Sequence, residues 1–297
     1  MEEEYLCMLP DDCVSAILSW TTPLDACTSS LVSSSLRSVA DSDAVWDKFL
    51  PSDYPQIVSA SSLTTPTINF SSKKQLYARL CSPLLLHGGT KSFVLEKESG
   101  KKSYILSARE LSITWSNEPM YWVWSSTPKS RFSEVAVLRA TSWLEIKAKM
   151  RSGMLSPNTK YGAYLIMEIT ERAYGLDSMP CETSVEVVGN HRHHVSATTA
   201  YLQCPHSNKQ QTERPFYTNR SMQKKMKINN GCDEHRLPCK RKDGWTEIEL
   251  GEFFSGQTTM DGDDDEAITM TLKEVKGYQL KAGLIIEGIE LRPNTKQ

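Results

Sequence analysis

The sequence lacks the features that mark membrane, secreted and disulfide-rich proteins. No apolar run approaches the roughly 20 residues that a membrane-spanning helix needs. The eight cysteines are scattered and form no Cys-x-x-Cys pair, far below the density of a disulfide scaffold. The first residues, MEEEYLCMLPDD, are acidic, where a secretory signal is basic and then apolar. We therefore expect a soluble intracellular protein with reduced thiols, located in the cytoplasm and nucleus.

An excess of basic charge is also absent. With 34 Lys and Arg against 36 Asp and Glu the net charge is -2, which argues against a dedicated nucleic-acid binder. The charge is nevertheless distributed unevenly. Residues 1–50 contain nine acids and two bases, whereas residues 205–245 contain ten bases and four acids. This asymmetry, in a chain that is 39% hydrophobic and 24% charged, indicates a globular protein of at least two modules.

Residues 1–51 have the pattern of a small helical module. Pro10, with the two aspartates that follow it, is typical of a helix start, and further starts are predicted at Pro23 and Ser42. Apolar residues recur at helical spacing in these segments: Val14, Ile17, Leu18, Leu31, Val32, Leu36, Val39, Val45, Trp46 and Phe49. So short a segment cannot bury a stable core alone. We therefore expect part of its apolar surface to face another protein.

The segment LPDDCVSAILSWTTPLDACTSSLVSSSLRSVADSDAVWDKFLP resembles an F-box. F-boxes dock on the Skp-family adaptor of a cullin-RING ubiquitin ligase, so the resemblance implies these partners. The docking residues that it implies are Leu9, Pro10, Ile17, Leu18, Leu31, Val32 and Trp46. The alternative is that these residues pack only a local helical core.

Residues 52–92 are predicted to form a linker. PSDYPQIVSASSLTTPTINFSSKK is rich in Pro, Ser and Thr and is interpreted as a loop with little regular structure. Apolar residues at helical spacing predict one helix over 73–81, and HGGTKS at 87–92 predicts a turn before a strand.

From residue 93 the hydrophobic period changes to two. About nine short segments rich in β-branched and aromatic residues are separated by turn signals, without intervening helical periods. Residues 93–293 are therefore predicted to form a jelly-roll-like antiparallel β-sandwich, which makes the whole chain an α+β protein of an all-α module followed by an all-β domain. In one strand Thr246, Ile248 and Leu250 share one face, and Trp245, Glu247 and Glu249 share the other.

Tryptophan is concentrated in this domain. A tryptophan ring can stack on the flat C–H face of a sugar while a carboxylate accepts hydrogen bonds from the hydroxyls. Trp115, Trp122 and Glu247 fit these roles chemically, whereas Trp124 and Trp143 are predicted to be core residues.

The successive segments LSITWSNEPMYWVW, AVLRATSWLEI, DGWTEIELGEFF and GLIIEGIELRP resemble the phloem protein two-like (Nictaba-like) lectin domain. The resemblance implies a β-sandwich that binds oligomers of N-acetylglucosamine or N-glycan cores. It places binding on two tryptophans seven residues apart and on acids in the GW-x-E-I stretch, which here are Trp115, Trp122, Glu247 and Glu252. With the F-box it implies a non-catalytic, substrate-recognising ligase subunit. The alternative is a receptor whose sandwich recognises a protein surface and has lost sugar binding.

A polar, basic insertion at 205–243 distinguishes the chain from stand-alone lectins of this kind. Lys224, Lys225 and Lys227, or Lys240 to Lys242, could form a nuclear-import patch, and the alternative is a solvated basic loop. The insertion could also narrow or cover a sugar site. Residues 294–297 are a short tail.

Other clusters predict no metal, cofactor or catalysis. Cys232, His235 and Cys239 have the spacing of a zinc half-site, but no second half accompanies them. Glu247 and Glu249 lie about 7 Å apart on one strand, within the range of inverting glycosidases, but side by side instead of across a scissile bond. The acidic run at 261–266 lacks the glutamate of a calcium loop and is predicted to be a solvated turn.

Overall fold

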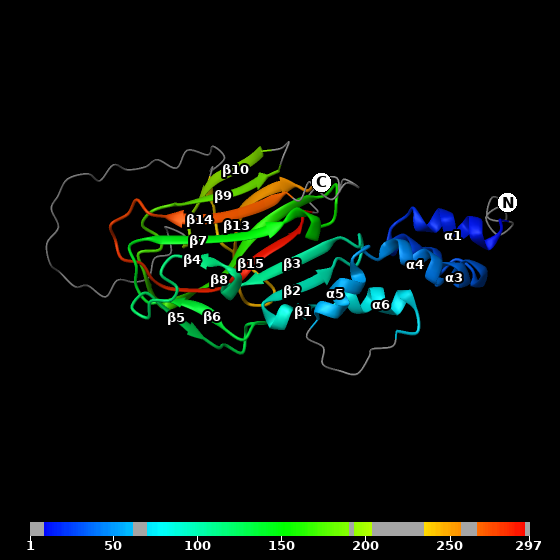
Figure 1. Ribbon diagram of the computed structural model, residues 1–297, viewed down its shortest axis with the longest axis horizontal. Coiled ribbons are helices and arrows are strands. Elements are labelled where there is room, and N and C mark those ends of the chain that lie inside the picture. The colour runs from blue at the N-terminus through cyan, green and yellow to red at the C-terminus, as the bar shows by residue number, and fades with distance from the viewer. Residues whose placement is uncertain (1–8, 62–69, 190–192, 204–234, 257–265, 295–297) are drawn as a thin grey trace.

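The computed structural model describes residues 9–61, 70–189, 193–203, 235–256 and 266–294. A group of short helices projects from one end of a body made of two β-sheets (Figure 1). The predicted succession of a helical module and an antiparallel β domain is confirmed. Within the described residues, no helix has both the length and the apolar character needed to cross a membrane.

Four helices form the N-terminal module: α1 (Asp11–Ser19), α2 (Pro23–Ser29), α3 (Ser34–Ala40) and α4 (Asp43–Phe49). Thr22 and Asp25 form a reciprocal capping box at the start of α2, and the Ser33 side chain caps α3. Ser42 occupies the N-cap of α4 but makes no capping hydrogen bond with its side chain. The predicted helix starts are confirmed.

The linker contains more helix than predicted. The helix expected at 73–81 is present as α6 (Lys73–Leu80), but residues interpreted as a loop form a further helix, α5 (Tyr54–Ala60). Pro55 lies in the first turn of α5, where proline is tolerated, and Ile57 is buried. A surrounding composition rich in Pro, Ser and Thr therefore concealed a short helix of about two turns, which tertiary packing stabilises.

The helices and the sandwich share one hydrophobic core. A single cluster of buried residues extends from Val14 in α1, through Trp46 and Tyr77, to the strands. The Tyr77 hydroxyl donates to the carbonyl oxygens of Glu96 and Lys97 at 3.2 Å each, and Lys102 pairs with Asp53 at 2.7 Å. The short helical module thus completes its core against the rest of the chain.

Nine strands form the first sheet, in the order β1-β2-β3-β15-β8-β13-β12 with β5 and β6 paired alongside β15. Their bounds are β1 (Leu84–Leu86), β2 (Lys91–Leu95), β3 (Lys102–Ser107), β5 (Trp122–Ser125), β6 (Val135–Leu138), β8 (Lys160–Tyr174), β12 (Cys239–Lys240), β13 (Thr246–Phe254) and β15 (Ala282–Pro293).

Six strands form the second sheet, in the order β11-β10-β9-β14-β7-β4. Their bounds are β4 (Ser112–Ile113), β7 (Leu144–Arg151), β9 (Cys181–Val188), β10 (His193–Ala200), β11 (His235–Arg236) and β14 (Ala267–Glu274). All strand pairs between the described residues are antiparallel except β10 with β11.

The alternation predicted for β13 is confirmed. Ile248 and Leu250 are buried in the core between the sheets. Trp245 is also buried, but on the other face of the first sheet, in a smaller cluster with Ile105, Phe132, Val135 and Ile166. The first sheet is therefore covered on part of its outer face as well, around the start of β13.

The end of the sandwich away from the helices, here called the distal end, consists of the segments 114–121, 139–143, 175–180 and 275–281 (Figure 1). A buried ion pair joins Lys281, in the segment 275–281, to Glu274 at the end of β14. Lys281 Nζ donates to the carbonyl oxygen of Ser142 at 2.9 Å, and Glu274 Oε1 accepts from the Gly277 amide at 2.7 Å. The Ser142 carbonyl and the Gly277 amide thus replace water as hydrogen-bond partners of the Lys281 and Glu274 charges. These bonds hold the loops of the distal end in place.

Candidate functional site

Two indole N–H groups fix the segment that carries Trp115. Trp122 Nε1 donates to the carbonyl oxygen of Thr114, and Trp124 Nε1 donates to that of Ser116, each at 3.1 Å. These two acceptors lie immediately before and after Trp115 in the chain. Trp122 and Trp124 therefore hold both sides of Trp115 and position it.

Trp115 itself has a left-handed backbone, with φ of 60°, which a bulky residue adopts only under constraint. Continued strand alternation would place its side chain in the core with Ile113. Instead the ring is 43% exposed and stacks on Tyr121, with the centroids 4.8 Å apart and the planes 29° apart. One face of the Trp115 ring is thus covered by a partner ring, while much of the side chain meets solvent.

The predicted role of Trp122 as a sugar-stacking residue is wrong for this conformation. Its side chain is only 2% exposed and lies in the core between the sheets. Its buried ring and engaged N–H make it a positioning residue for Trp115. The residue that shares the aromatic surface with Trp115 is Tyr121.

Glu247 lies far from the tryptophans. In the first sheet β8, β15 and β6 separate β13 from β5, which makes four inter-strand steps, or about 19 Å. Glu247 is paired with Ile166 on the outward face, whereas Trp122 points into the core. The predicted convergence of Trp115, Trp122 and Glu247 on one groove does not occur.

Glu247 is instead neutralised by arginines. Arg292 binds both of its carboxylate oxygens, at 2.6 and 2.7 Å, and Arg241 Nη1 lies 2.5 Å from Oε2. Burial opposes the charge on Glu247, but the hydrogen bonds from Arg292 and Arg241 outweigh it and lower the pKa of the carboxyl. Glu252 has partners of the same kind, since it pairs with Lys160 at 2.6 Å and accepts a bond from Asn294. Both acids have structural partners that a sugar would have to displace.

Trp143 was predicted to be a core residue, and this is wrong because its side chain is 43% exposed at the distal end. Trp143 Nε1 donates to Glu145 Oε2 at 3.3 Å, and the Thr114 hydroxyl lies 3.4 Å from the same oxygen. Glu145 therefore connects Trp143 with the segment of Trp115. A hydrogen bond from Lys147 is the main cause of a lowered pKa at Glu145, against partial burial, and the bond from Trp143 adds to it.

The helical module exposes a second group of apolar side chains. Leu31 and Val32, in the turn between α2 and α3, are 75% and 68% exposed, and Leu9, Pro10 and Ile17 are also exposed. Leu18 and Trp46 are buried, so their predicted docking role is wrong and they belong to the local core. The prediction missed Trp20, which is 90% exposed, and Leu24. Trp20 follows Ile17 by three residues, which places both on the same side of α1, and this spacing is the sequence signal for its exposure beside Ile17.

The other predicted clusters fall largely outside the described residues, including Lys224, Lys225, Lys227, Cys232 and the acidic run at 261–265. In the remaining chain no three metal-binding side chains gather. Of the basic run 240–242, Lys240 and Lys242 are exposed, but Arg241 is engaged with Asp243, Glu247 and Glu290.

The protein thus has two parts, a helical module with exposed apolar side chains and a β-sandwich with exposed tryptophans at its far end. Comparison with known proteins agrees. The model of the F-box domain matches residues 6–48, and that of the Phloem protein 2 family matches residues 101–293.

Relatives cover almost the whole chain. The F-box protein PP2-B15 of Arabidopsis thaliana is 54% identical, and the match covers 96% of each chain. The F-box protein VBF of the same plant is 50% identical over 97% of this chain and 99% of its own. The F-box protein PP2-B13 is 51% identical over 96% and 98%. The chain therefore belongs to the family of F-box proteins that carry a phloem protein 2 domain, as the resemblance implied. An F-box domain implies an adaptor of the Skp family as partner.

Proposed function

We propose that this chain is the substrate-recognition subunit of a Skp-cullin-F-box ubiquitin ligase, and that its sandwich binds glycans or glycoproteins. The helical module binds the adaptor, and the distal end of the sandwich binds the target. The chain itself makes and breaks no bond; it brings the target close to the ligase.

The exposed apolar residues of the helical module support adaptor docking. Ile17, Trp20, Leu24, Leu31 and Val32 all keep large exposed side chains, although the same module contributes to a continuous core. Contiguous exposed apolar surface is typical of protein–protein interaction sites. Burial of such side chains contributes about 1.5–3 kcal/mol each, which makes them suited to a stable complex.

Trp115 is the observation that carries the glycan part of the proposal. Its unusual backbone, its exposed ring and the two indole N–H groups that fix its neighbours make a pre-organised aromatic surface. Such a surface suits the flat apolar face of a sugar ring. The family resemblance suggests N-acetylglucosamine-containing glycans as the ligands.

The test is a glycan array probed with the full-length chain, with Trp115→Ala as the variant. We expect the parent to retain N-acetylglucosamine oligomers or N-glycan cores and the variant to lose them. Adaptor binding, measured in parallel, should be unaffected, because Trp115 lies at the opposite end of the molecule from the helices. Equal retention by both proteins would contradict the assignment of Trp115.

A second candidate, recognition of a protein surface without sugar binding, is favoured by the buried state of Trp122 and the ion pairs of Glu247. Two of the groups that the lectin resemblance implies are thus engaged in structure. A parent protein that binds no glycan on the array, yet captures a deglycosylated target through the distal end, would establish this alternative.

A further inference from the structure

We propose that the outer face of the six-stranded sheet binds an extended oligosaccharide along a row of polar side chains. The row consists of Thr114, Glu145, Lys273, Glu182 and Thr199, and is called the polar row below. This inference rests on the proposed glycan-binding function and gives that function a site and a ligand length.

Strand register places these five residues in line. Glu145 is paired with Lys273, Lys273 with Glu182, and Glu182 with Thr199. The Thr114 amide donates to the carbonyl oxygen of Glu145 at 3.0 Å, which continues the register of β4 with β7. Directly paired residues point to the same face of a sheet, so the polar row crosses it in four steps, or about 19 Å.

One end of the polar row carries aromatic surface. Trp143 donates its N–H to Glu145, which fixes the ring beside the row. Trp115 follows Thr114 directly in the chain. If a sugar ring stacks on these aromatic side chains, the nearby Glu145 carboxylate can accept hydrogen bonds from its hydroxyl groups.

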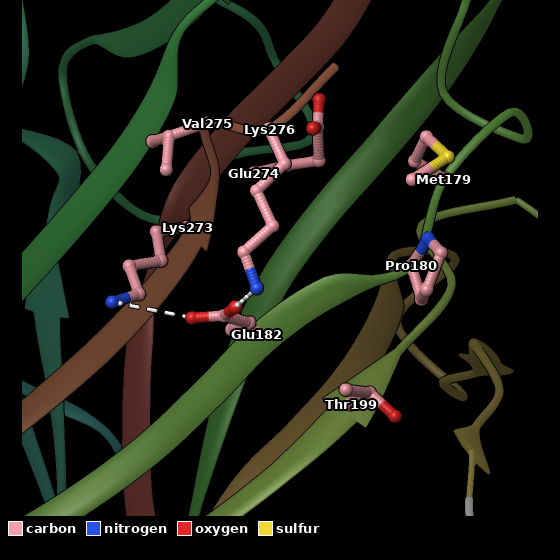
Figure 2. Close-up of a pocket in the computed structure, with 8 residues that line it drawn as sticks. All are labelled: Met179, Pro180, Glu182, Thr199, Lys273, Glu274, Val275 and Lys276. Carbon is pink, nitrogen blue, oxygen red and sulfur yellow. Dashed lines mark hydrogen bonds and ion pairs between the residues drawn. The ribbon is translucent and has the colours of Figure 1, made fainter.

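The other end of the polar row enters a pocket of about 200 Å³, shown in Figure 2. Met179, Pro180 and Val275 supply apolar lining, and Thr199 and the charged residues Glu182 and Lys273 of the row complete the wall. Glu182 lies between Lys273 at 3.2 Å and Lys276 at 2.5 Å (Figure 2). Apolar walls with a few fixed polar groups are the usual composition of a ligand pocket.

The charges along the polar row favour a neutral ligand. Glu145 is paired with Lys147, and Glu182 with Lys273 and Lys276, so both signs are already matched. A nucleic acid or a strongly acidic peptide would meet carboxylates as well as amines. A chain of hydroxyl and amide groups can instead donate to the carboxylates and accept from the lysines.

The test is calorimetric titration of the full-length chain with N-acetylglucosamine oligomers, from the dimer to the hexamer. We expect the affinity to rise with length until the oligomer spans the polar row, and then to level off. Trp143→Ala should weaken binding of every length about tenfold through lost stacking. Thr199→Val should weaken only the longer oligomers, about fivefold, through one lost hydrogen bond.

Phe254→Ala is the matched control, because Phe254 is an exposed aromatic residue that lies at the C-terminal end of β13, in the nine-stranded sheet and away from the polar row. It should leave all affinities unchanged, and the thermal unfolding of each variant verifies its fold. As an independent readout, a long oligomer should protect Lys273 and Lys276 from acylation but leave Lys240 reactive.

The outcomes separate this inference from the function on which it rests. If the parent binds oligomers with an affinity independent of length and Trp143→Ala changes nothing, the polar row is wrong while glycan binding stands. If the parent binds no glycan on the array or in the titration, glycan binding and the polar row are both overturned. The parent could also bind a polypeptide but no oligomer. If Trp143→Ala then lost the polypeptide, the outer face of the six-stranded sheet would be assigned to a protein target.

Discussion

The helical module and the sandwich both expose large apolar side chains, but for different structural reasons. The module exposes Trp20, Leu31 and Val32 in a segment too small to hide them, whereas the sandwich buries the residues between its sheets and exposes two tryptophans, Trp115 and Trp143, among other apolar side chains of its surface. Exposure in the module follows from limited volume. Exposure of Trp115 in the sandwich instead depends on its left-handed backbone and on the two hydrogen bonds that flank it.

This contrast shows that the meaning of an exposed apolar side chain depends on whether neighbouring residues hold it in a fixed position. Leu31 lies in a turn, and its exposure needs no special arrangement. Trp115 is held by Trp122, Trp124 and Tyr121, so its exposed ring is pre-organised. The first kind of surface suits a large flat partner, and the second suits a small ligand.

The largest expected effect is on the support of Trp115. Trp122→Ala should lower the free energy of unfolding by about 3–5 kcal/mol, because it empties a buried site and removes the bond to Thr114. Trp143→Ala, at an exposed site, should cost less than about 1 kcal/mol. Chemical denaturation of both variants measures the difference, and equal costs would contradict the assignment of Trp122 as a positioning residue.

The next effect concerns the exposed turn of the helical module. The double variant Leu31→Asp, Val32→Asp should weaken adaptor binding at least about 100-fold, since it places charge in an apolar contact. The free energy of unfolding should change by less than about 1 kcal/mol, because both side chains are exposed. Titration with a purified Skp-family adaptor provides the measurement.

The control for this pair is Leu280→Asp, an exposed leucine at the distal end of the sandwich. It should bind the adaptor as the parent does. Undiminished adaptor binding by the double variant would show that the turn between α2 and α3 is not part of the docking surface.

A smaller effect is expected at the arginine-bound acids. The pKa values of Glu247 and Asp243 are lowered in the folded state, because hydrogen bonds from arginines outweigh the cost of burial. Their stabilisation is therefore complete above the ordinary carboxyl pKa and is lost as the pH falls through the lowered values. Glu247→Gln should cost about 1–3 kcal/mol at neutral pH and reduce the acid-dependent part of the unfolding free energy.

Denaturation of parent and Glu247→Gln between pH 7 and acid pH provides this comparison. Glu134→Gln, which breaks an exposed pair with Arg109, should change stability by less than about 0.5 kcal/mol and serves as the control. Sugar binding should survive Glu247→Gln, and its loss would restore Glu247 to the glycan site.

The smallest effect is expected at the contact between helix α6 and the sandwich. Tyr77→Phe removes the hydroxyl that bonds to the carbonyl oxygens of Glu96 and Lys97, and should cost about 1 kcal/mol. Because one core extends through both parts, parent and variant should each unfold in a single cooperative transition. Two separate transitions in the parent would contradict the shared core.

The sequence patterns predicted elements well and their assembly poorly. Helical spacing identified α1, α4 and α6, and the period of two in β13 correctly separated Ile248 and Leu250 from Glu247. These are local properties of the chain. Helix α5 was missed because the segment around it is rich in Pro, Ser and Thr, while the helix itself buries Ile57 against the rest of the protein.

The candidate site was predicted only in part, for a related reason. Trp115 and Trp122 were chosen together as a pair seven residues apart, but spacing does not reveal which ring the backbone turns outward. Only the left-handed conformation at Trp115 separates the two. Glu145 was not predicted at all, because its link to Trp143 and Thr114 depends on strand register.

The shared core has a consequence for how a bound target would be presented. A flexible tether lets a captured molecule sample many positions, whereas a stiff spacer fixes both its distance and its angle. Tyr77 and the Lys102–Asp53 pair join the helices to the sandwich through one shared core, so this chain forms a stiff spacer between its two proposed binding surfaces. In a ligase of the proposed kind, target lysines within reach would therefore experience a high effective concentration of the ubiquitin donor, and those elsewhere almost none.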